Sequence, residues 1–246
     1  MTKKSKITHT SNQICFIGPR IEEVLNMHPQ DAFQPERMTK IVEEFTRGFY
    51  FLKDFGLAAT IFGSARAPKN SIAYKETERL AYLLSKDGFD IITGGGPGVM
   101  EAANKGATEA GGRSGGINIQ LFHEQRVNKY VTESSAFYYF FIRKVMLAFA
   151  SEVYIFFPGG FGTLDEFFEL VTLVQTKKIE PIPIILVDKD YWNPLLHWIQ
   201  KEVYGKRKAI SKGDMDLYHV AKDADHAFQL IRKMVIRTDR KVDGML

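Results

Sequence analysis

Cysteine is almost absent from this chain of 246 residues, which contains Cys15 alone. A single cysteine excludes an intramolecular disulfide and favours a reducing compartment. Long apolar runs are absent as well. No stretch approaches the ~18 apolar residues of a membrane span, and none of signal-peptide length follows the basic N-terminus. We therefore expect a soluble, cytoplasmic protein with no membrane partner.

Patterns for metals and for the commonest nucleotide ligands are missing too. The six histidines show no metal-ligand spacing, so no metal site is predicted. The dinucleotide pattern G-x-G-x-x-G fails because Val99 and Asp165 stand where it requires glycine or alanine. No G-x-x-x-x-G-K-[ST] loop occurs either. These absences argue against a dinucleotide or a hydrolysed triphosphate as the ligand.

Strong charge of either sign is also lacking. Lysine and arginine number 33, and aspartate and glutamate number 29, which leaves a net charge of +4. This mild excess fits a small anionic ligand and does not call for nucleic acid. With 45% hydrophobic residues, the chain can bury the core of one α/β domain and still carry an extension.

The N-terminal part of the chain differs from the rest. Residues 1–34 show no regular pattern and contain the turn-forming pairs Gly-Pro and His-Pro. From Pro35 to Leu52, apolar residues recur at helical spacing, which predicts an amphipathic helix that packs on another layer. We therefore divide the chain into an N-terminal extension, 1–56, and a main domain, 57–246.

In the main domain, runs typical of strands alternate with runs typical of helices. This alternation predicts an α/β fold with a Rossmann-like, mostly parallel sheet and helices on both faces. The expected strands are 58–62, 89–93, 115–120, 152–157 and 183–187. The expected helices are 72–87, 98–110, 137–149, 165–177, 191–203 and 223–236.

The most distinctive motif is Pro158-Gly159-Gly160-Phe161-Gly162-Thr163-Leu164-Asp165-Glu166, between a strand-like run and a helix-like run. Glycines let the backbone approach an anion closely, and the N–H groups that begin a helix favour negative charge. Glu166 is expected within the first helical turn. Two similar turns, 94–98 and 63–66, also follow strands. Since carboxyl ends of parallel strands meet at one edge, we predict a single phosphate-binding crevice with a carboxylate beside it.

Spacing alone leaves other interpretations open. The glycines can serve a tight turn only, and Thr163-x-x-Glu166 also matches a capping box, in which the glutamate binds the N-cap N–H. We do not expect Asp165 and Glu166 to form a two-carboxylate glycosidase pair, because adjacent helical side chains point apart. The aromatic run 137–141 is more typical of a core or a subunit interface than of base stacking.

Three stretches together resemble one family, the Lonely Guy (LOG) family of cytokinin riboside 5′-monophosphate phosphoribohydrolases. They are Gly94–Asn104, Phe141–Met146 and Pro158–Glu166. The resemblance covers roughly 57–205 and is nearest to the longer bacterial subtype. Such sequences have also been described as lysine decarboxylases, but that chemistry needs a lysine for a pyridoxal-phosphate Schiff base, and none stands out.

The resemblance implies hydrolysis of the N-glycosidic bond of a nucleoside 5′-monophosphate. The substrate would be AMP or a cytokinin riboside 5′-monophosphate, and the products the free base and ribose 5-phosphate. It implies no cofactor, and it implies a homodimer or a higher homo-oligomer. The alternative is a nucleotide-binding regulatory protein without turnover.

The resemblance also implies roles for individual residues. Arg143, on a helix expected to start after Ser134-Ser135, and Glu166 correspond to catalytic positions. The other implied substrate-binding residues are Gly159, Gly160, Gly162, Thr163, Lys144, Gly63, Ser64, Gly95, Gly96, Glu101, Glu124 and Thr172. Without the resemblance, Arg143 and Lys144 fit an ordinary surface pair, and Glu124 fits an ordinary surface carboxylate.

Overall fold

The computed structural model describes residues 35–120 and 127–234. Ile41–Leu246 forms one compact unit, and Met1–Lys40 is a separate one. The helix predicted to start at Pro35 is confirmed as α2, Pro35–Lys53. The division of the chain near residue 56 stays a prediction. No helix among the described residues is both long enough and apolar enough to cross a membrane.

A seven-stranded sheet lies at the centre of the larger unit, with the order β4-β3-β2-β1-β5-β6-β7. Every neighbouring pair of strands is parallel. The strands are β1 Ala58–Phe62, β2 Asp90–Thr93, β3 Ser114–Ile119, β4 Glu133–Phe137, β5 Val153–Phe156, β6 Ile184–Val187 and β7 His219–Ala221. The α/β fold with a parallel sheet is thus confirmed.

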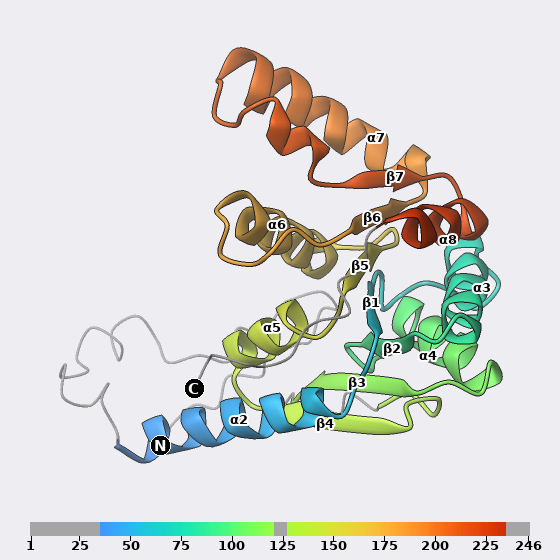
Figure 1. Cartoon of the computed structure of the whole chain (residues 1–246), viewed down its shortest axis with the longest axis vertical. Helices are drawn as coiled ribbons and strands as arrows, with labels where there is room; N and C mark the ends of the chain where they lie inside the picture. Colours follow the sequence, from blue (N-terminus) through green and yellow to red (C-terminus); the bar gives the residue numbers. More distant parts are fainter. Residues whose placement is uncertain (1–34, 121–126, 235–246) are drawn as a thin grey trace, which may run out of the picture. The chain divides into compact units, whose positions relative to one another are not determined.

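The helices that follow the strands cover both faces of the sheet (Figure 1). They are α3 Ile72–Lys86, α4 Val99–Glu109, α5 Phe140–Ala148, α6 Phe161–Gln175, α7 Lys189–Trp198 and α8 Ala224–Lys233. A π-helix, Ile199–Lys206, continues α7, and a short 3₁₀ helix covers Gly213–Asp216. In Figure 1, α5 and α6 lie on one side of the strands and α3 and α4 on the other.

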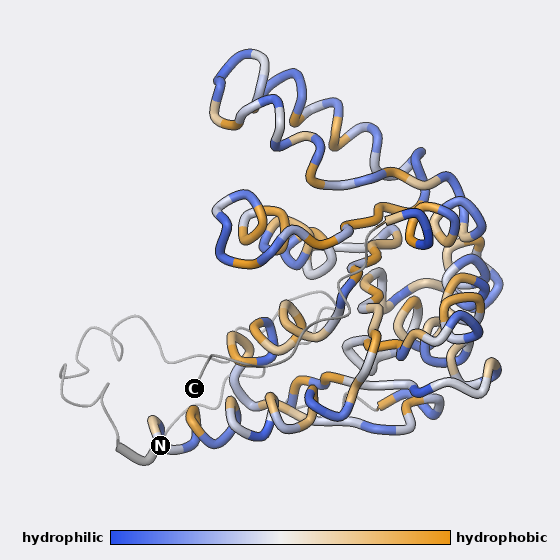
Figure 2. The backbone as a smooth tube through the Cα atoms, viewed as in Figure 1, coloured by the Kyte–Doolittle hydropathy of each residue, from blue (hydrophilic) through white to orange (hydrophobic). Residues whose placement is uncertain are grey.

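Alternating strand residues build two separate cores, because successive side chains point to opposite faces. Along β5, Tyr154 and Phe156 join the core under α5, α6 and α7, whereas Val153 and Ile155 join the core under α3, α4 and α8. Figure 2 shows the hydrophobic residues gathered along the central strands. Full burial of such side chains contributes about 1.5–3 kcal/mol each.

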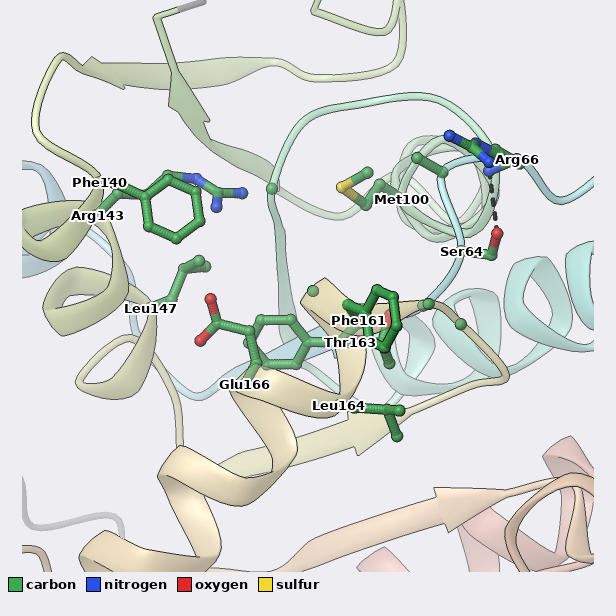
Figure 3. Close-up of a pocket in the computed structure, with 17 residues that line it drawn as sticks. Ser64, Arg66, Met100, Phe140, Arg143, Leu147, Phe161, Thr163, Leu164 and Glu166 are labelled. Atoms are coloured by element: carbon green, nitrogen blue, oxygen red, sulfur yellow. Dashed lines mark hydrogen bonds between the residues drawn. The ribbon is translucent and has the colours of Figure 1, made fainter. Parts of the chain in front are cut away.

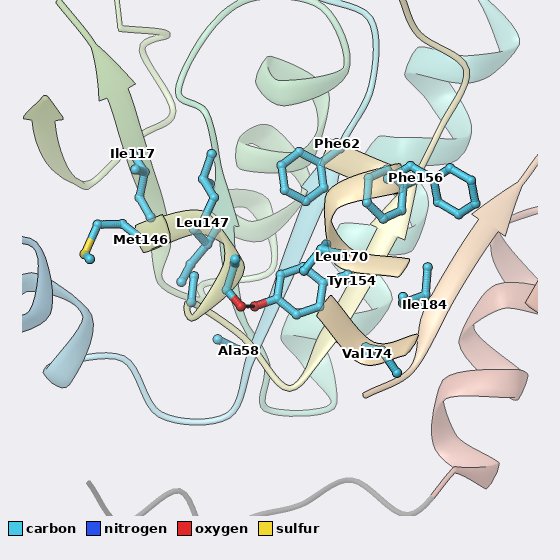
Figure 4. Close-up of a cluster of buried hydrophobic side chains, with 14 of the residues drawn as sticks. Ala58, Phe62, Ile117, Met146, Leu147, Tyr154, Phe156, Leu170, Val174 and Ile184 are labelled. Atoms are coloured by element: carbon cyan, nitrogen blue, oxygen red, sulfur yellow. Dashed lines mark hydrogen bonds between the residues drawn. The ribbon is translucent and has the colours of Figure 1, made fainter. Parts of the chain in front are cut away.

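The core under α5 and α6 also fixes one polar group. The Tyr154 hydroxyl donates a hydrogen bond of 2.6 Å to the Ala148 carbonyl at the end of α5 (Figure 4). Tyr154 is fully buried, so this bond satisfies a hydroxyl that has no access to water. It ties the C-terminal end of α5 to the centre of the sheet.

Two predicted boundaries are wrong, for reasons beyond local sequence. The helix expected from residue 137 begins at Phe140, because Glu133–Phe137 pairs with β3 as β4. That segment, which contains Ser134-Ser135, is mostly polar and gives no strand signal. The helix expected from 165 begins at Phe161, with Gly160 as its N-cap. The three-residue strand β7 was also not predicted.

Three turns meet at the carboxyl edge of the adjacent strands β2, β1 and β5. The Ser64 N–H donates to the Pro158 carbonyl, and the Val99 N–H donates to the Ser64 carbonyl, both at 3.0 Å. Gly98 has a φ of +68°, and a Cβ there would overlap the Ser64 carbonyl, so the close approach of these turns requires glycine. The predicted convergence of the three turns is therefore present.

Candidate active site

A cavity of about 720 Å³ opens where the three turns meet (Figure 3). Its lining comes from 62–66 at the end of β1, Gly94 and Met100 around the start of α4, three residues of α5, and 159–164 with Glu166 at the start of α6. The three residues of α5 are Phe140, Arg143 and Leu147. Four segments that are far apart in the sequence therefore share one site.

The first turn of α6 forms the base of this cavity. Gly160 is the N-cap residue, and no side chain makes a capping hydrogen bond there. Its carbonyl accepts hydrogen bonds from the N–H groups of Thr163 and Leu164. The N–H groups of Phe161 and Gly162 have no acceptor within 35–120 and 127–234. They lie at the positive end of the helix dipole, where an anion is favoured.

The capping-box interpretation of Thr163 and Glu166 is wrong. Thr163 is the third residue of α6 and Glu166 the sixth, so Thr163 is not the N-cap. Glu166 consequently lies in the second turn of the helix and not in the first. The Thr163 side chain lies against Gly159, where a Cβ would overlap it. This contact explains the need for glycine at position 159.

Glu166 is a buried carboxylic acid on the cavity wall. Its residue is 6% exposed, and no hydrogen bond from the described chain reaches its carboxylate. Burial raises its pKa to about 7, while the positive charges of Lys144 and Arg143 oppose the rise. Near neutral pH both the acid and the carboxylate form of Glu166 are therefore populated. A group with such a pKa can accept or donate a proton during a reaction.

Arg143 brings a guanidinium to the same end of the cavity as Glu166, while Ser64 and Arg66 lie at the other end (Figure 3). Its Nε donates a hydrogen bond of 2.8 Å to the Ile117 carbonyl, and its guanidinium lies 5.9 Å from the Phe140 ring centre. Burial lowers the pKa of Arg143, and the charge of Glu166 opposes this. An arginine nonetheless stays charged at neutral pH.

Gly94 makes room for this guanidinium. A Cβ on Gly94 would overlap Arg143 Nη2 and approach the sulfur of Met100 to 2.9 Å. The rest of that turn is held by one half-buried amide, since the Asn128 side chain donates to the carbonyls of Gly95 and Gly96 at 3.2 and 3.0 Å. Gly95 and Gly96 therefore shape the turn and do not line the cavity.

The structure brings eight of the predicted site residues to the cavity. They are Gly63, Ser64, Arg143, Gly159, Gly160, Gly162, Thr163 and Glu166. Substrate contacts by these residues stay predictions, because the cavity shows where they lie and not what they bind.

Other predicted residues lie away from the lining. Lys144 pairs with Asp165 at 2.6 Å and with Glu169 at 3.2 Å. Glu101 pairs with Lys69 at 2.7 Å. Thr172 is exposed further along α6. Glu124 lies outside the described residues. Their predicted roles are not tested by these positions.

Several lining residues were not predicted from the sequence. Arg66 follows the weakest of the three glycine turns, and its N–H donates to the Ser64 hydroxyl at 3.1 Å. Phe140 belongs to the aromatic run, of which only Phe137 is fully buried. Phe161 is 93% exposed at the mouth of the cavity. Phe161 could have been predicted as a lining residue, because it is an apolar residue inside a glycine turn expected to border the crevice.

No lysine lines the part of the cavity that the structure describes. The described residues also contain no group of three or more His, Cys, Asp or Glu side chains placed to hold a metal ion. The polar groups that line the cavity thus include one carboxylic acid, two guanidinium groups, the hydroxyls of Ser64 and Thr163, and the N–H groups at the start of α6.

Comparisons with known proteins show which family the chain resembles. A family model described as "Possible lysine decarboxylase" matches residues 100–231. The cytokinin riboside 5′-monophosphate phosphoribohydrolase LOG4 of Arabidopsis thaliana is 33% identical over 153 residues, which are 61% of this chain and 70% of that protein. The corresponding enzyme of Rhodococcoides fascians is 24% identical over 178 residues, 71% of this chain and 89% of that protein.

Solved structures support the fold. The molybdenum cofactor binding protein of Rippkaea orientalis superposes with a TM-score of 0.53 at 23% identity, over 72% of this chain and 94% of that chain. At this identity the likeness concerns the fold alone. The family match covers more than half of the sequence and includes Arg143 and the whole of α6. The chain therefore belongs to the LOG family, whose sequence model bears the description "Possible lysine decarboxylase".

Proposed function

We propose that this protein hydrolyses the N-glycosidic bond of a nucleoside 5′-monophosphate, AMP or a cytokinin riboside 5′-monophosphate. The observation that carries the proposal is a single cavity that joins Arg143 and Glu166 to the N-terminal turn of α6. Curated relatives named as phosphoribohydrolases support the reaction class. Water adds to C1′ of the ribose, the C1′–N bond breaks, and the base leaves with a proton.

The first turn of α6 binds the 5′-phosphate in this proposal. The backbone N–H groups of Phe161 and Gly162 and the Thr163 hydroxyl supply donors, and the glycines allow close approach. Arg66, from the turn after β1, lines the same cavity and adds positive charge to it. Binding energy from the phosphate, which does not react, then orients the ribose for the chemical step.

Glu166 acts on the ribose. Positive charge develops on the sugar ring as the glycosidic bond breaks, and a carboxylate in a partly dry cavity stabilises such charge strongly. The ribose hydroxyls donate hydrogen bonds to Glu166, and these bonds fix the position of the ribose. With a pKa near 7, the carboxylate can also accept a proton from the attacking water.

Arg143 acts on the leaving base. Its Nε is held by the Ile117 carbonyl, and its Nη atoms make no hydrogen bond within the described residues. They are free to donate to acceptors on the base and to draw negative charge from the breaking bond. Because an arginine does not readily release its proton, the role is hydrogen bonding and charge stabilisation and not acid catalysis.

An assay with purified protein tests this proposal. AMP, GMP, CMP and isopentenyl-AMP are each incubated with the protein, and free base and ribose 5-phosphate are separated by chromatography. We expect base release from at least one monophosphate and none from the matching nucleoside. AMP that binds but stays intact would contradict hydrolysis and favour a regulatory nucleotide-binding protein.

We further infer that the protein forms a homo-oligomer. Large apolar side chains stay exposed on α2, on α5 and at the C-cap of α5, among them Phe49, Phe141 and Phe149 at 49%, 48% and 43%. The ring centres of Phe49 and Phe149 lie 6.4 Å apart, so exposed apolar side chains of α2 and of the end of α5 lie side by side. Such a surface is typical of subunit contacts.

A further inference from the structure

The helix that carries Arg143 does not cap its own N-terminus. The N-cap of α5, Tyr139, makes no side-chain capping bond, and the first turn of α5 contains no acidic residue. In a capping box, a glutamate at the third helical position binds the N-cap N–H. That position of α5 is Ile142, which has no acceptor.

Glu44 of α2 supplies the missing acceptor from another helix. Its two carboxylate oxygens accept hydrogen bonds from the N–H groups of Tyr138 and Tyr139, at 2.8 and 3.2 Å. Glu44 is 8% exposed, although its neighbour on the same helix, Glu43, faces solvent. A buried carboxylate at a helix N-terminus is favoured by both the hydrogen bonds and the helix dipole.

Further contacts between α2 and the α5 region strengthen this connection. Arg47 Nη2 donates a hydrogen bond of 2.7 Å to the Ala136 carbonyl, just before the turn into α5. A Cβ on Gly48 would overlap the side chain of Met146, so the two helices approach closely there. The Phe45 and Phe141 rings lie 6.4 Å apart. Helix α2 therefore contacts α5 and the segment before it at several points.

The path from Glu44 to Arg143 is short. Glu44 holds the Tyr139 N–H, and the Tyr139 carbonyl accepts the Arg143 N–H at 3.2 Å, in the first turn of α5. The other end of Arg143 is held by the Ile117 carbonyl. Different elements thus position the two ends of Arg143. Glu44 holds the turn that carries its backbone, and the Ile117 carbonyl holds its guanidinium.

We propose that Glu44 is a positioning residue for Arg143, so that α2 is part of the apparatus that places the guanidinium in the cavity. The inference rests on the proposed function, in which Arg143 contacts the base. Loss of the cap lets the first turn of α5 shift, and a displacement of about 1 Å can lower a rate on the order of 100-fold.

Kinetics of matched variants of the full chain test the proposal. Glu44→Ala should lower kcat by about 10- to 100-fold and raise the KM for AMP, because a displaced Arg143 also binds the base less well. Glu44→Gln keeps one carbonyl acceptor and should recover most of the rate. Glu43→Ala, one residue away and exposed, should behave as wild type. Equal kcat values for Glu44→Ala and wild type would overturn the proposal.

A double-mutant cycle separates positioning from general loss of structure. In an Arg143→Ala background, Glu44→Ala should cause no further fall in kcat, because residues that act through one another are not additive. A full additional loss would overturn the proposal. If Glu44→Ala does not fold, Arg47→Ala replaces it in the cycle, since Arg47 is exposed and its bond to Ala136 anchors the same turn.

AMP affinity provides a readout that needs no turnover. Measured calorimetrically in a Glu166→Gln background, it should fall by similar factors for Glu44→Ala and Arg143→Ala, with no further fall in the combination. This result can appear even if wild-type protein releases no base, so failure of the proposed reaction is distinguishable from failure of the positioning role. A loss of AMP affinity from Glu44→Ala that is as large in the Arg143→Ala background as without it would overturn the positioning role.

Discussion

At the scale of single residues, Glu166 decides how the site responds to pH. It is almost fully buried, and its pKa of about 7 lies above the ordinary value of 4.5 because burial disfavours the charged form. The nearby cations Lys144 and Arg143 limit the rise and do not cancel it. The ionised form required by the proposed chemistry is therefore present in quantity only near and above neutral pH.

The first prediction concerns the pH dependence of base release. Since kcat/KM reports the ionisation of the free enzyme, it should rise with pH through about 7 and fall about tenfold per unit below that value. The measurement is kcat/KM for the best monophosphate from pH 5 to 9. A profile that is flat across this range would show that Glu166 need not be ionised.

The second prediction concerns stability. The pKa of Glu166 is about 7 in the folded protein and about 4.5 in the unfolded chain. Ionisation of Glu166 therefore lowers the free energy of unfolding as the pH rises from 4.5 to 7. It has no effect below about pH 4.5 and its full effect above 7. The full cost is about 3 kcal/mol, from the size of the pKa shift. Glu166→Gln should therefore raise the melting temperature at pH 8 and change it little at pH 4.5, while activity is lost.

Asp165→Asn is the matched control for that experiment. Asp165 is the neighbouring carboxylate, its side chain is 53% exposed, and it pairs with Lys144. Its replacement removes a charge without relieving burial, so no stabilisation at pH 8 is expected. A stabilisation equal to that of Glu166→Gln would mean that net charge, and not desolvation of Glu166, is the cause.

At the scale of elements, the two glycines at the start of α6 have different surroundings, one closely packed and one open. A Cβ on Gly159 would overlap Thr163, whereas a Cβ on Gly162 meets no atom within 4 Å. The two glycines therefore differ in why the fold uses them. Gly159 allows close packing of the turn on its own helix, and Gly162 leaves space on the cavity side.

The third prediction follows from this difference. Gly159→Ala should destabilise the protein by about 1–3 kcal/mol, as overpacking does. Gly162→Ala should keep wild-type stability, because alanine is favoured over glycine within a helix. Chemical denaturation of both variants provides the comparison. Equal stability of the two would show that Thr163 moves aside without cost.

At the scale of the whole molecule, the fourth prediction concerns assembly. If the apolar surface of α2 and α5 is a subunit contact, light scattering should give a mass of at least two chains. Phe149→Glu should reduce that mass to one chain. Ile72→Glu is the control, since Ile72 is 79% exposed on α3, which packs on the other face of the sheet. A single-chain mass for wild type would contradict the inferred oligomer.

The sequence by itself determined most of the elements and the three glycine turns. Strand runs such as Val153–Phe156, helical apolar spacing and glycine clusters are local patterns, and they predicted the parallel α/β fold and the edge at which its turns meet. It also placed Arg143 and Glu166 among the candidate residues, through motifs that resemble one family. Local patterns suffice here because β-strand and helix periodicities follow from backbone geometry.

Only the tertiary structure decided which side chains share the cavity. It turned Lys144 toward Asp165 and Glu169, brought Arg66 and Phe140 to the lining, and showed that Glu44 caps the helix of Arg143. It also made the polar segment Glu133–Phe137 a strand, through pairing with β3. These outcomes depend on burial and on contacts between distant segments, which short-range spacing does not encode.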